Sequence, residues 1–316
     1  MTGSELNVLL AETISRYISA EAHIVDIRSR AVATSSSGGE FVRHEVTYRV
    51  GDNRPEVVRL VTKLAGVVER KAWRLLNCQG QPSVPFSHAL DYSEPEKALI
   101  CLEDVGDERR PTSLEPITEQ ELTLEATGLA SIHLASLGKG TELDWLPRID
   151  RAYVEWSIDT MWRPTWTKVR TDATFIQTFE KDIPMVEATA TSIIDDVGAL
   201  VDQDDSLTLI HNDINPSNVL VRREMPFYID WQTAAYGPWY LDLPHHFCNL
   251  RQAEHYRKAI AQRGASISAG IFAEHYRVAA RYIGLRYMWW TLQQWQADHN
   301  QTAWVRHYLG LISGHV

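Results

Sequence analysis

A polar loop follows the short apolar stretch at residues 207–210 and contains an aspartate and an asparagine five positions apart, Asp213 and Asn218. Loops gain little from packing and carry function disproportionately often. A carboxylate can orient an attacking hydroxyl group and accept its proton, while a neutral amide can offer an oxygen to Mg²⁺. The pair therefore suits the transfer of a phosphoryl group from a magnesium-bound nucleotide to an alcohol.

A second carboxylate, Asp230, supports this interpretation because it directly follows the apolar residues 227–229, which are typical of a short strand. The spacing of Asp213 and Asn218 is that of the kinase catalytic loop, H-R-D-x-x-x-x-N, and kinases take a further metal-binding aspartate from a later segment. Each residue alone has an ordinary explanation as a turn residue. Together they predict a kinase-type site with Asn218 and Asp230 as metal ligands.

A lysine and a glutamate in the first part of the chain fit the nucleotide side of this chemistry. Lys63 lies near the end of the strand-like run EVVRLVTKL, where its ammonium group can face the α- and β-phosphates. Glu69, on the helix expected next, can pair with Lys63 and fix its position. The alternatives are a solvated lysine at a strand end and a surface contact between Glu69 and Trp73.

Two main-chain features complete the expected nucleotide site. A turn of small residues between two strands can donate N–H groups to phosphates, although an ordinary hairpin turn explains it equally well. This turn consists of Ser36, Ser37, Gly38 and Gly39. The segment LICLEDVGD is expected to be a hinge at which the main chain of Glu103 and Val105 binds adenine.

Three segments together resemble the aminoglycoside phosphotransferase and choline kinase family, within the protein-kinase-like fold. They are LIHNDINPSNVLV, FYIDWQTAAYGPWYLDLP and the helical LASIHLASLG, which contains His133. The resemblance is specific over residues 207–244 and looser over 32–138. It implies ATP, with GTP as the open alternative, and Mg²⁺ as cofactors.

The resemblance also implies a role for individual residues. Asp213 is expected to be the catalytic base, with Asn218 and Asp230 on Mg²⁺. His211 is expected to brace the metal-binding segment structurally, and Asp242 to hold the catalytic loop in place.

Two departures from the kinase pattern bear on regulation and on function. Asn212 stands where protein kinases have the arginine that pairs with a phosphorylated activation loop, and Gly237 follows Asp213 by only 24 positions. Both features disfavour a protein kinase. The usual Asp-Phe-Gly becomes Asp230-Trp231-Gln232. A pseudokinase-like nucleotide-binding protein is the other rival, and the intact set of catalytic residues argues against it.

The pattern of elements predicts an α+β, two-lobed protein-kinase-like fold, with an antiparallel-sheet N-lobe at 1–103, a hinge at 104–107 and a mainly helical C-lobe at 108–316. A capping box at Thr118 and Glu121 begins a helix that ends at Gly138. The other expected helices cover residues 4–20, 67–78, 150–161, 168–180, 184–200 and the region from about 250 onward. The expected strands cover residues 23–32, 41–50, 56–64, 85–92, 97–103 and the flanks of the loop at 207–230.

The composition limits the classes of partner. The net charge of −10 argues against nucleic-acid and anionic-membrane binding. No apolar run is long enough for a membrane helix, and the first residues lack the features of a signal peptide. Three scattered cysteines do not form a disulfide or zinc pattern, so we expect a reducing, cytoplasmic setting.

The acceptor is constrained mainly by charge. Residues 107–316 carry 19 basic and 27 acidic side chains, which favours a cationic acceptor such as an amino sugar or amino alcohol, although a solubilising surface explains the balance equally well. Asp159, Asp242 and Glu274 are candidate acidic lining residues. The aromatic residues at 287–295 could hold an ammonium group or stack on a sugar, but a core role is favoured. We therefore expect a small hydroxylated acceptor, with an amine-bearing one preferred.

Overall fold

The computed structural model describes residues 3–32, 41–94, 96–203 and 205–314. The turn that contains Ser36, Ser37, Gly38 and Gly39 lies outside the described residues. The chain divides into two compact units. Unit 1 comprises Met1–Glu108 and Val219–Thr233, and unit 2 comprises Arg109–Asn218 and Ala234–Val316.

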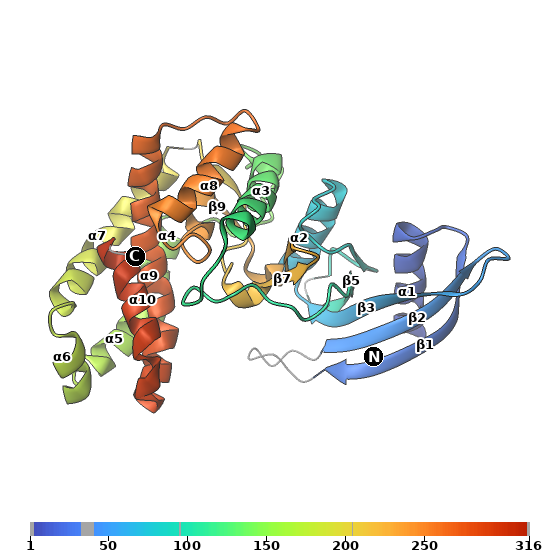
Figure 1. The fold of residues 1–316 in the computed structure, drawn as a ribbon, viewed down its shortest axis with the longest axis horizontal. Coiled ribbons are helices and arrows are strands. Elements are labelled where there is room, and N and C mark those ends of the chain that lie inside the picture. The colour runs from blue at the N-terminus through green and yellow to red at the C-terminus, as the bar shows by residue number, and fades with distance from the viewer. Residues whose placement is uncertain (1–2, 33–40, 95, 204, 315–316) are drawn as a thin grey trace. The chain divides into compact units, whose positions relative to one another are not determined.

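Unit 1 contains a five-stranded antiparallel sheet in the order β1-β2-β3-β5-β4 (Figure 1). Its strands are β1 (Ala22–Val32), β2 (Phe41–Val50), β3 (Glu56–Ala65), β4 (Ser87–Ala89) and β5 (Ala98–Glu103). The alternating apolar residues of the first three runs predicted these strands, and the structure confirms them. In this register Lys63 of β3 lies between Phe41 of β2 and Ile100 of β5.

One face of this sheet is covered by α1 (Gly3–Tyr17), whose apolar residues pack with the side chains of three strands. Leu10 and Ile14 of α1 belong to the same buried cluster as Val46 of β2 and Leu60 of β3. Successive side chains of a strand point to opposite faces, so Lys63, three residues after Leu60, projects from the face that α1 does not cover.

A helix and a hairpin complete unit 1. The helix α2 (Val67–Cys78) contacts the short 3-10 helix η3 (Trp231–Thr233), which follows the hairpin of β7 (Val219–Arg222) and β8 (Met225–Tyr228). Residues 219–233 therefore belong to unit 1 by their contacts, whereas the expected lobe boundaries placed them with the C-terminal part of the chain.

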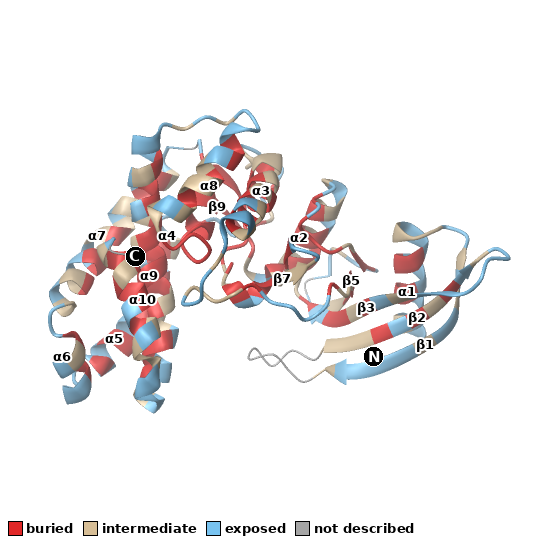
Figure 2. Ribbon diagram, viewed as in Figure 1, coloured by how far each residue is buried: buried red, intermediate tan, exposed pale blue. Residues whose placement is uncertain are grey.

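Unit 2 is mainly helical. The capping box of α3 (Glu119–Ser136) is present as predicted, with the Thr118 side chain accepting from Glu121 N–H and the Glu121 side chain accepting from Thr118 N–H. Helix α8 (Leu250–Ala261) packs against α3, and α10 (Thr302–Ser313) runs beside the long α9 (Ala269–Ala297) (Figure 1). The middle of α9 is largely buried (Figure 2).

The remaining helices of unit 2 correct one expectation. A single helix over 168–180 was wrong, because two helices, α5 (Arg163–Val169) and α6 (Ala173–Phe179), occupy this region. The Asp172 carboxylate accepts from Thr174 N–H at 2.8 Å and Phe175 N–H at 3.0 Å and so begins α6 afresh. The other elements are α4 (Arg151–Ser157), the π-helix η1 (Ile158–Trp162) and α7 (Ile183–Val201).

A two-stranded antiparallel sheet within unit 2 carries the polar loop. Strand β6 (Leu207–Ile210) pairs with β9 (Ala235–Pro238), and all eight residues of the pair are buried. The loop after β6 ends in the 3-10 helix η2 (Pro216–Asn218), and the 3-10 helix η4 (Trp239–Asp242) follows β9. The expected catalytic loop therefore begins at the end of β6, and the segment that contains Asp242, which was expected to hold this loop, begins at the end of β9.

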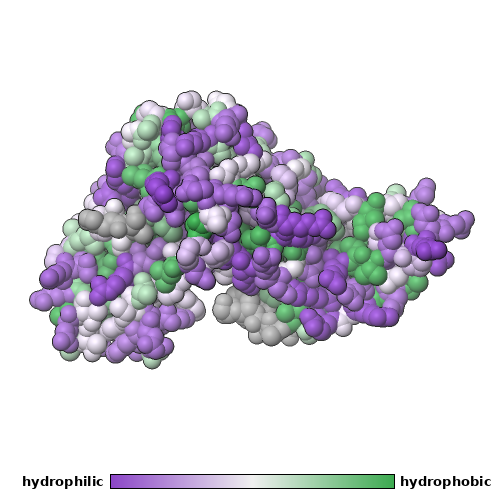
Figure 3. Space-filling model, in the orientation of Figure 1, coloured by the Kyte–Doolittle hydropathy of each residue, from purple (hydrophilic) through white to green (hydrophobic). Residues whose placement is uncertain are grey.

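The surface is predominantly hydrophilic on the face shown in Figure 3, with hydrophobic residues in separate patches. Among the described residues, no helix combines the length and the apolar character that a membrane span requires.

Candidate active site

The loop after β6 is held by the buried carboxylate of Asp242. Its Oδ2 accepts from His211 N–H at 2.7 Å, and its Oδ1 accepts from Asn212 N–H at 2.9 Å. His133 of α3 places Nε2 3.2 Å from the same Oδ2 and has its other ring nitrogen 2.8 Å from the hydroxyl of Tyr256. The contact expected of Asp242 with the catalytic loop is therefore present. The ring of His133 contacts the same Asp242 carboxylate and helps to hold it in place.

These hydrogen bonds determine the protonation of Asp242. Burial alone would raise the pKa of this carboxyl group, but the His133 hydrogen bond, the nearby His133 and His211 rings and the His211 N–H together lower its pKa. The ionised Asp242 carboxylate accepts from both loop N–H groups. These hydrogen bonds stabilise its negative charge, and the charged carboxylate in turn stabilises the loop conformation.

Within the loop, Asn218 is bound to Asp213 in a way that leaves its oxygen available. The Asn218 amide nitrogen donates to the main-chain oxygen of Asp213 at 2.8 Å. Asn218 is 9% exposed. Because the nitrogen is committed, the amide oxygen is the group that can bind a cation, and an amide oxygen is a hard ligand of the kind that Mg²⁺ prefers. The residue fits its predicted role as a metal ligand.

The carboxylate of Asp213 itself is oriented by neighbouring donors. The hydroxyl of Tyr287, on α9, donates to Oδ1 at 2.8 Å, and the amide nitrogen of Asn215 lies 3.3 Å from the same oxygen. Oδ2 has a long contact of 3.5 Å with the amide nitrogen of Asn218. The main-chain nitrogen of Asp213 lies 3.3 Å from His211 Nδ1, and the structural role expected of this histidine stays a prediction.

Asn212, where protein kinases have arginine, has a left-handed backbone with φ of 62°. Asparagine tolerates this conformation better than most residues. Its side-chain oxygen accepts from the buried guanidinium of Arg286, and its amide nitrogen donates to the hydroxyl of Tyr153 at 3.1 Å. The sequence reasoning missed Arg286, although an arginine within an otherwise apolar stretch of a buried helix was a usable signal.

Unit 1 carries the second group of expected site residues. Lys63 Nζ lies 2.6 Å from Glu69 Oε1 and 2.7 Å from Asp230 Oδ1. The ion pair expected between Lys63 and Glu69 is thus present, while the alternative contact of Glu69 with the Trp73 indole N–H, at 3.4 Å, is also made. Burial alone would lower the pKa of Lys63, but the two carboxylates outweigh burial and raise it. Lys63 is therefore a fixed positive charge.

Asp230 also has geometry that suits a ligand. Its backbone is left-handed, with φ of 65°, and its Oδ2 lies 3.3 Å from the amide nitrogen of Gln232. Gln232, the residue that departs from Asp-Phe-Gly, therefore contacts the predicted ligand. No cluster of three or more His, Cys, Asp or Glu side chains fit for a metal occurs among the described residues. Mg²⁺ commonly takes one or two protein oxygen ligands together with substrate phosphates, and Asp230 in unit 1 and Asn218 in unit 2 each carry an oxygen of this kind.

The expected hinge offers one main-chain donor. Glu103 N–H donates to Phe86 O at 2.9 Å, and the Glu103 side chain pairs with Arg222 at 2.6 Å. The N–H of Val105 has no hydrogen-bond partner among the described residues. The Val105 N–H is therefore available as a donor, and its use by an adenine ring stays a prediction.

Two of the expected acidic lining residues, Asp159 and Glu274, are exposed. Asp159 Oδ1 accepts from Arg163 at 2.8 Å on the surface of η1. Glu274 is exposed on α9 and precedes Tyr287 by 13 residues, which is about 20 Å along a helix. The structure therefore does not bring Glu274 to Asp213, and an acceptor role for either residue stays a prediction.

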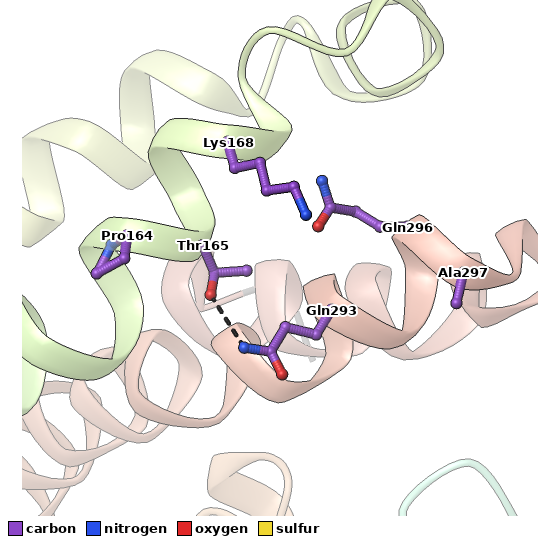
Figure 4. Close-up of a pocket in the computed structure, with 6 residues that line it drawn as sticks. All are labelled: Pro164, Thr165, Lys168, Gln293, Gln296 and Ala297. Atoms are coloured by element: carbon purple, nitrogen blue, oxygen red, sulfur yellow. Dashed lines mark hydrogen bonds between the residues drawn. The ribbon is translucent and has the colours of Figure 1, made fainter.

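An open pocket of about 520 Å³ lies between α5 and the C-terminal half of α9. Thr165 and Gln293 form a hydrogen bond of 3.5 Å at its wall, and Lys168 and Gln296 extend toward one another (Figure 4). Pro164 and Ala297 complete the lining. The pocket carries a lysine and no carboxylate, so its charge does not match the cationic acceptor that the overall acidity favours.

Residues 47–280 match the model of the phosphotransferase enzyme family known as APH, and the chain belongs to this family. No curated protein matches the sequence. The resemblance to aminoglycoside phosphotransferases and choline kinases is confirmed.

Solved structures show the same fold. The spectinomycin phosphotransferase APH(9)-Ia, in complex with ADP and spectinomycin, has a TM-score of 0.58 at 14% identity, with 97% of each chain covered. Choline kinase from Cryptosporidium parvum Iowa II has a TM-score of 0.59 at 13% identity, covering 98% of this chain and 95% of that one. The GDP and kanamycin complex of APH(2")-IIia has a TM-score of 0.52 at 13% identity, with 97% of each chain covered. The two-lobed, kinase-like α+β fold is thereby confirmed.

Proposed function

We propose that this protein is an ATP- and Mg²⁺-dependent O-phosphotransferase that acts on a small hydroxylated, amine-bearing molecule of the aminoglycoside, amino sugar or amino alcohol type. The observation that carries the proposal is the hydrogen-bonded loop in which Asn218 fixes the main chain of Asp213, in a chain that belongs to a phosphotransferase family. Neighbouring structures in complex with ADP and with GDP support a nucleotide substrate.

Asp213 acts on the acceptor in this proposal. Its Oδ2 accepts a hydrogen bond from the acceptor hydroxyl and orients the oxygen toward the γ-phosphorus. The new bond joins that oxygen to phosphorus, the bond from phosphorus to the β,γ-bridging oxygen breaks, and ADP leaves with the electron pair. The acceptor proton passes to Asp213 late in the step, since the transition state is loose.

The other residues bind the nucleotide and balance its charge. Lys63 holds the α- and β-phosphates, and Glu69 fixes Lys63. Asn218 and Asp230 are the protein ligands of Mg²⁺, which neutralises charge on the phosphates when bound. The main chain at Glu103 and Val105 binds adenine. Asp242 and His211 keep the catalytic loop in its shape.

The acceptor class rests on two supports. Residues 107–316 have a balance of 19 basic to 27 acidic side chains, which raises the local concentration of cationic molecules. Structural neighbours include complexes with spectinomycin and with kanamycin and a choline kinase. A reducing, cytoplasmic compartment belongs to the same proposal, supported by three free cysteines, Cys78, Cys101 and Cys248.

The deciding experiment is a coupled ADP-release assay with ATP or GTP and a panel of aminoglycosides, macrolides, amino sugars and choline-like alcohols. Acceptor-dependent ADP release that requires Mg²⁺, with a phosphorylated product detected by mass spectrometry, is the expected result. A Mg²⁺-dependent thermal shift with nucleotide but no turnover on any acceptor would instead support the pseudokinase-like alternative. Autophosphorylation as the sole transfer would point to a protein kinase.

A further inference from the structure

Two consecutive residues of α9 bind two consecutive residues of the catalytic loop. Arg286 donates to the side-chain oxygen of Asn212, and Tyr287 donates to the side-chain Oδ1 of Asp213. The Tyr287 hydroxyl also lies 3.1 Å from the main-chain oxygen of Asn212. All four residues belong to unit 2, so this arrangement is internal to one compact part of the molecule.

Packing against its neighbours fixes the orientation of the Tyr287 ring. The ring of His245 packs edge-on against it, with centroids 4.1 Å apart, and the guanidinium of Arg286 lies 5.3 Å from its centroid. A tyrosine has few rotatable bonds, so packing on both sides leaves its hydroxyl little freedom. The donor is therefore in place whether or not an acceptor is bound.

The hydroxyl also stays protonated. Burial raises the pKa of Tyr287 well above its ordinary value, and the nearby charge of Asp213 raises it further. A hydrogen bond from a neutral hydroxyl to a carboxylate is short and strong because the acceptor is ionised. The Tyr287 hydroxyl is thus a donor, and not an ionised acceptor, at neutral pH.

Arg286 makes the second contact between α9 and the catalytic loop, the one to Asn212. Its guanidinium is buried, and no carboxylate of the described residues lies within ion-pair distance of it. It faces the rings of Tyr153 and Tyr287 and the oxygen of Asn212. A buried cation is costly unless nearby groups compensate it. Burial alone would lower the pKa of Arg286, but three neighbouring tyrosines and, to a smaller extent, the charge of Asp213 raise it.

We propose that Tyr287 is a positioning residue for phosphoryl transfer, which fixes the Asp213 carboxylate through Oδ1 so that Oδ2 is presented to the acceptor hydroxyl, while Arg286 holds Asn212 beside it. The inference rests on the proposed function, because Asp213 is the base assigned there. It assigns to α9 the task of orienting the carboxylate, because Tyr287 of this helix donates to Asp213 and the adjacent Arg286 donates to Asn212.

The test is Tyr287→Phe, which keeps the ring and its packing and removes only the donor. We expect kcat for acceptor phosphorylation to fall about 10- to 100-fold, as misplacement of a catalytic group does. KM for ATP and the dissociation constant of Mg²⁺·ADP should change less than about twofold, because Asp213 orients the acceptor rather than the nucleotide. A purely structural role would not separate kcat from nucleotide binding in this way.

Tyr276→Phe is the matched control. Tyr276 is a buried tyrosine on the same helix, and its hydroxyl donates to the main-chain oxygen of Phe247. This variant should lose thermal stability to a similar extent but keep its kcat. An unchanged kcat in Tyr287→Phe, or an equal loss of kcat in both variants, would overturn the positioning role.

A crystal structure of Tyr287→Phe with Mg²⁺ and ADP separates this inference from the proposed function. We expect the Asp213 carboxylate to rotate away from its wild-type position. An unmoved carboxylate overturns the inference even if no acceptor is ever found. Failure of the wild-type protein to phosphorylate any acceptor, with the carboxylate displaced in the variant, would overturn the assigned function and leave the positioning contact supported.

Discussion

Asp242 Oδ2 accepts a hydrogen bond of 2.7 Å from the N–H of His211, so a fully buried carboxylate caps the first residue of the loop that contains the proposed base. The second oxygen accepts from the next N–H along, that of Asn212. Asp242 lies 31 residues from His211 in the sequence and reaches it because β6 and β9 pair and the chain turns back at η4. The strand pair therefore determines the loop conformation through one side chain.

Replacing Asp242 should damage the loop and the fold together. Asp242→Ala leaves two buried N–H groups and His133 without their acceptor, so we expect a loss of about 3–5 kcal/mol in the free energy of unfolding. Urea denaturation followed by tryptophan fluorescence measures it. Asp159→Ala is the control, because its pair with Arg163 is exposed and such pairs contribute about 0–1 kcal/mol. Similar losses in the two variants would show that Asp242 does not hold the loop.

Asp213→Asn should separate chemistry from binding. The amide keeps the shape of the carboxylate and can still accept from Tyr287, but it cannot take the acceptor proton, so kcat should fall at least about 10²- to 10⁴-fold. Mg²⁺·ATP binding measured by calorimetry should be nearly unchanged. A matching loss of nucleotide affinity would contradict the role assigned to Asp213.

Lys63→Met should reduce both activity and stability. The substitution leaves the carboxylates of Glu69 and Asp230 close together without their shared cation, so we expect a loss of about 3–5 kcal/mol in the free energy of unfolding. The loss of a cation at the phosphates should lower kcat/KM for ATP about 10²- to 10³-fold.

Arg59→Met is the control for Lys63→Met on the same strand. Its pair with Glu45 is exposed, with a separation of 3.4 Å, so both stability and kcat/KM should stay close to wild type. Full activity of Lys63→Met would mean that another cation faces the phosphates.

Much of the fold was predictable because its signals are local. The alternation in β2 and β3 and the capping box at Thr118 and Glu121 lie within a few residues of each other, and each formed the element expected. The loop residues Asp213 and Asn218 are likewise separated by one short turn. Local spacing therefore predicted the contact between Asp213 and Asn218.

The residues that the sequence did not reveal are those brought together by packing. Tyr287 and Asp213 are 74 positions apart, and helical periodicity shows that a helix has a buried face without showing which residue meets the loop. Tyr287 was expected to build the aromatic core, and its ring does pack on His245, but its hydroxyl has the second role of a donor to Asp213. Asp172, by contrast, was a readable cap that should have divided the helix expected over 168–180.

Gly284→Ala should destabilise unit 2 even though alanine is the better helix former. A Cβ at Gly284 would lie 2.7 Å from Ile312 Cγ1 and 3.0 Å from the main-chain oxygen of Tyr308, so α9 and α10 would have to separate. We expect a net loss of about 1–3 kcal/mol in the free energy of unfolding. Gly270→Ala, on the same helix with open space around the new Cβ, should instead gain up to about 1 kcal/mol. A gain at both positions would contradict the close approach of the two helices.

Stability should fall as the pH drops below neutrality, in part through His307. Burial lowers the pKa of His307 to about 4, and the same effect lowers the pKa of His44 and His245. The unfolded chain, with a histidine pKa of about 6.5, binds more protons than the folded protein between these two values. The contribution is therefore present above about pH 6.5 and is lost as the pH falls toward about 4.

His307→Phe removes this titration while it keeps an aromatic ring against Trp304 and Tyr308. Between about pH 7 and about pH 5, we expect the variant to lose about 2 kcal/mol less free energy of unfolding than the wild type. Urea denaturation at the two pH values measures the difference, and His23→Phe, at an exposed position of β1, should leave the pH dependence of the wild type unchanged. Equal pH dependence in His307→Phe and the wild type would show that His307 is protonated in the folded protein as readily as in the unfolded chain.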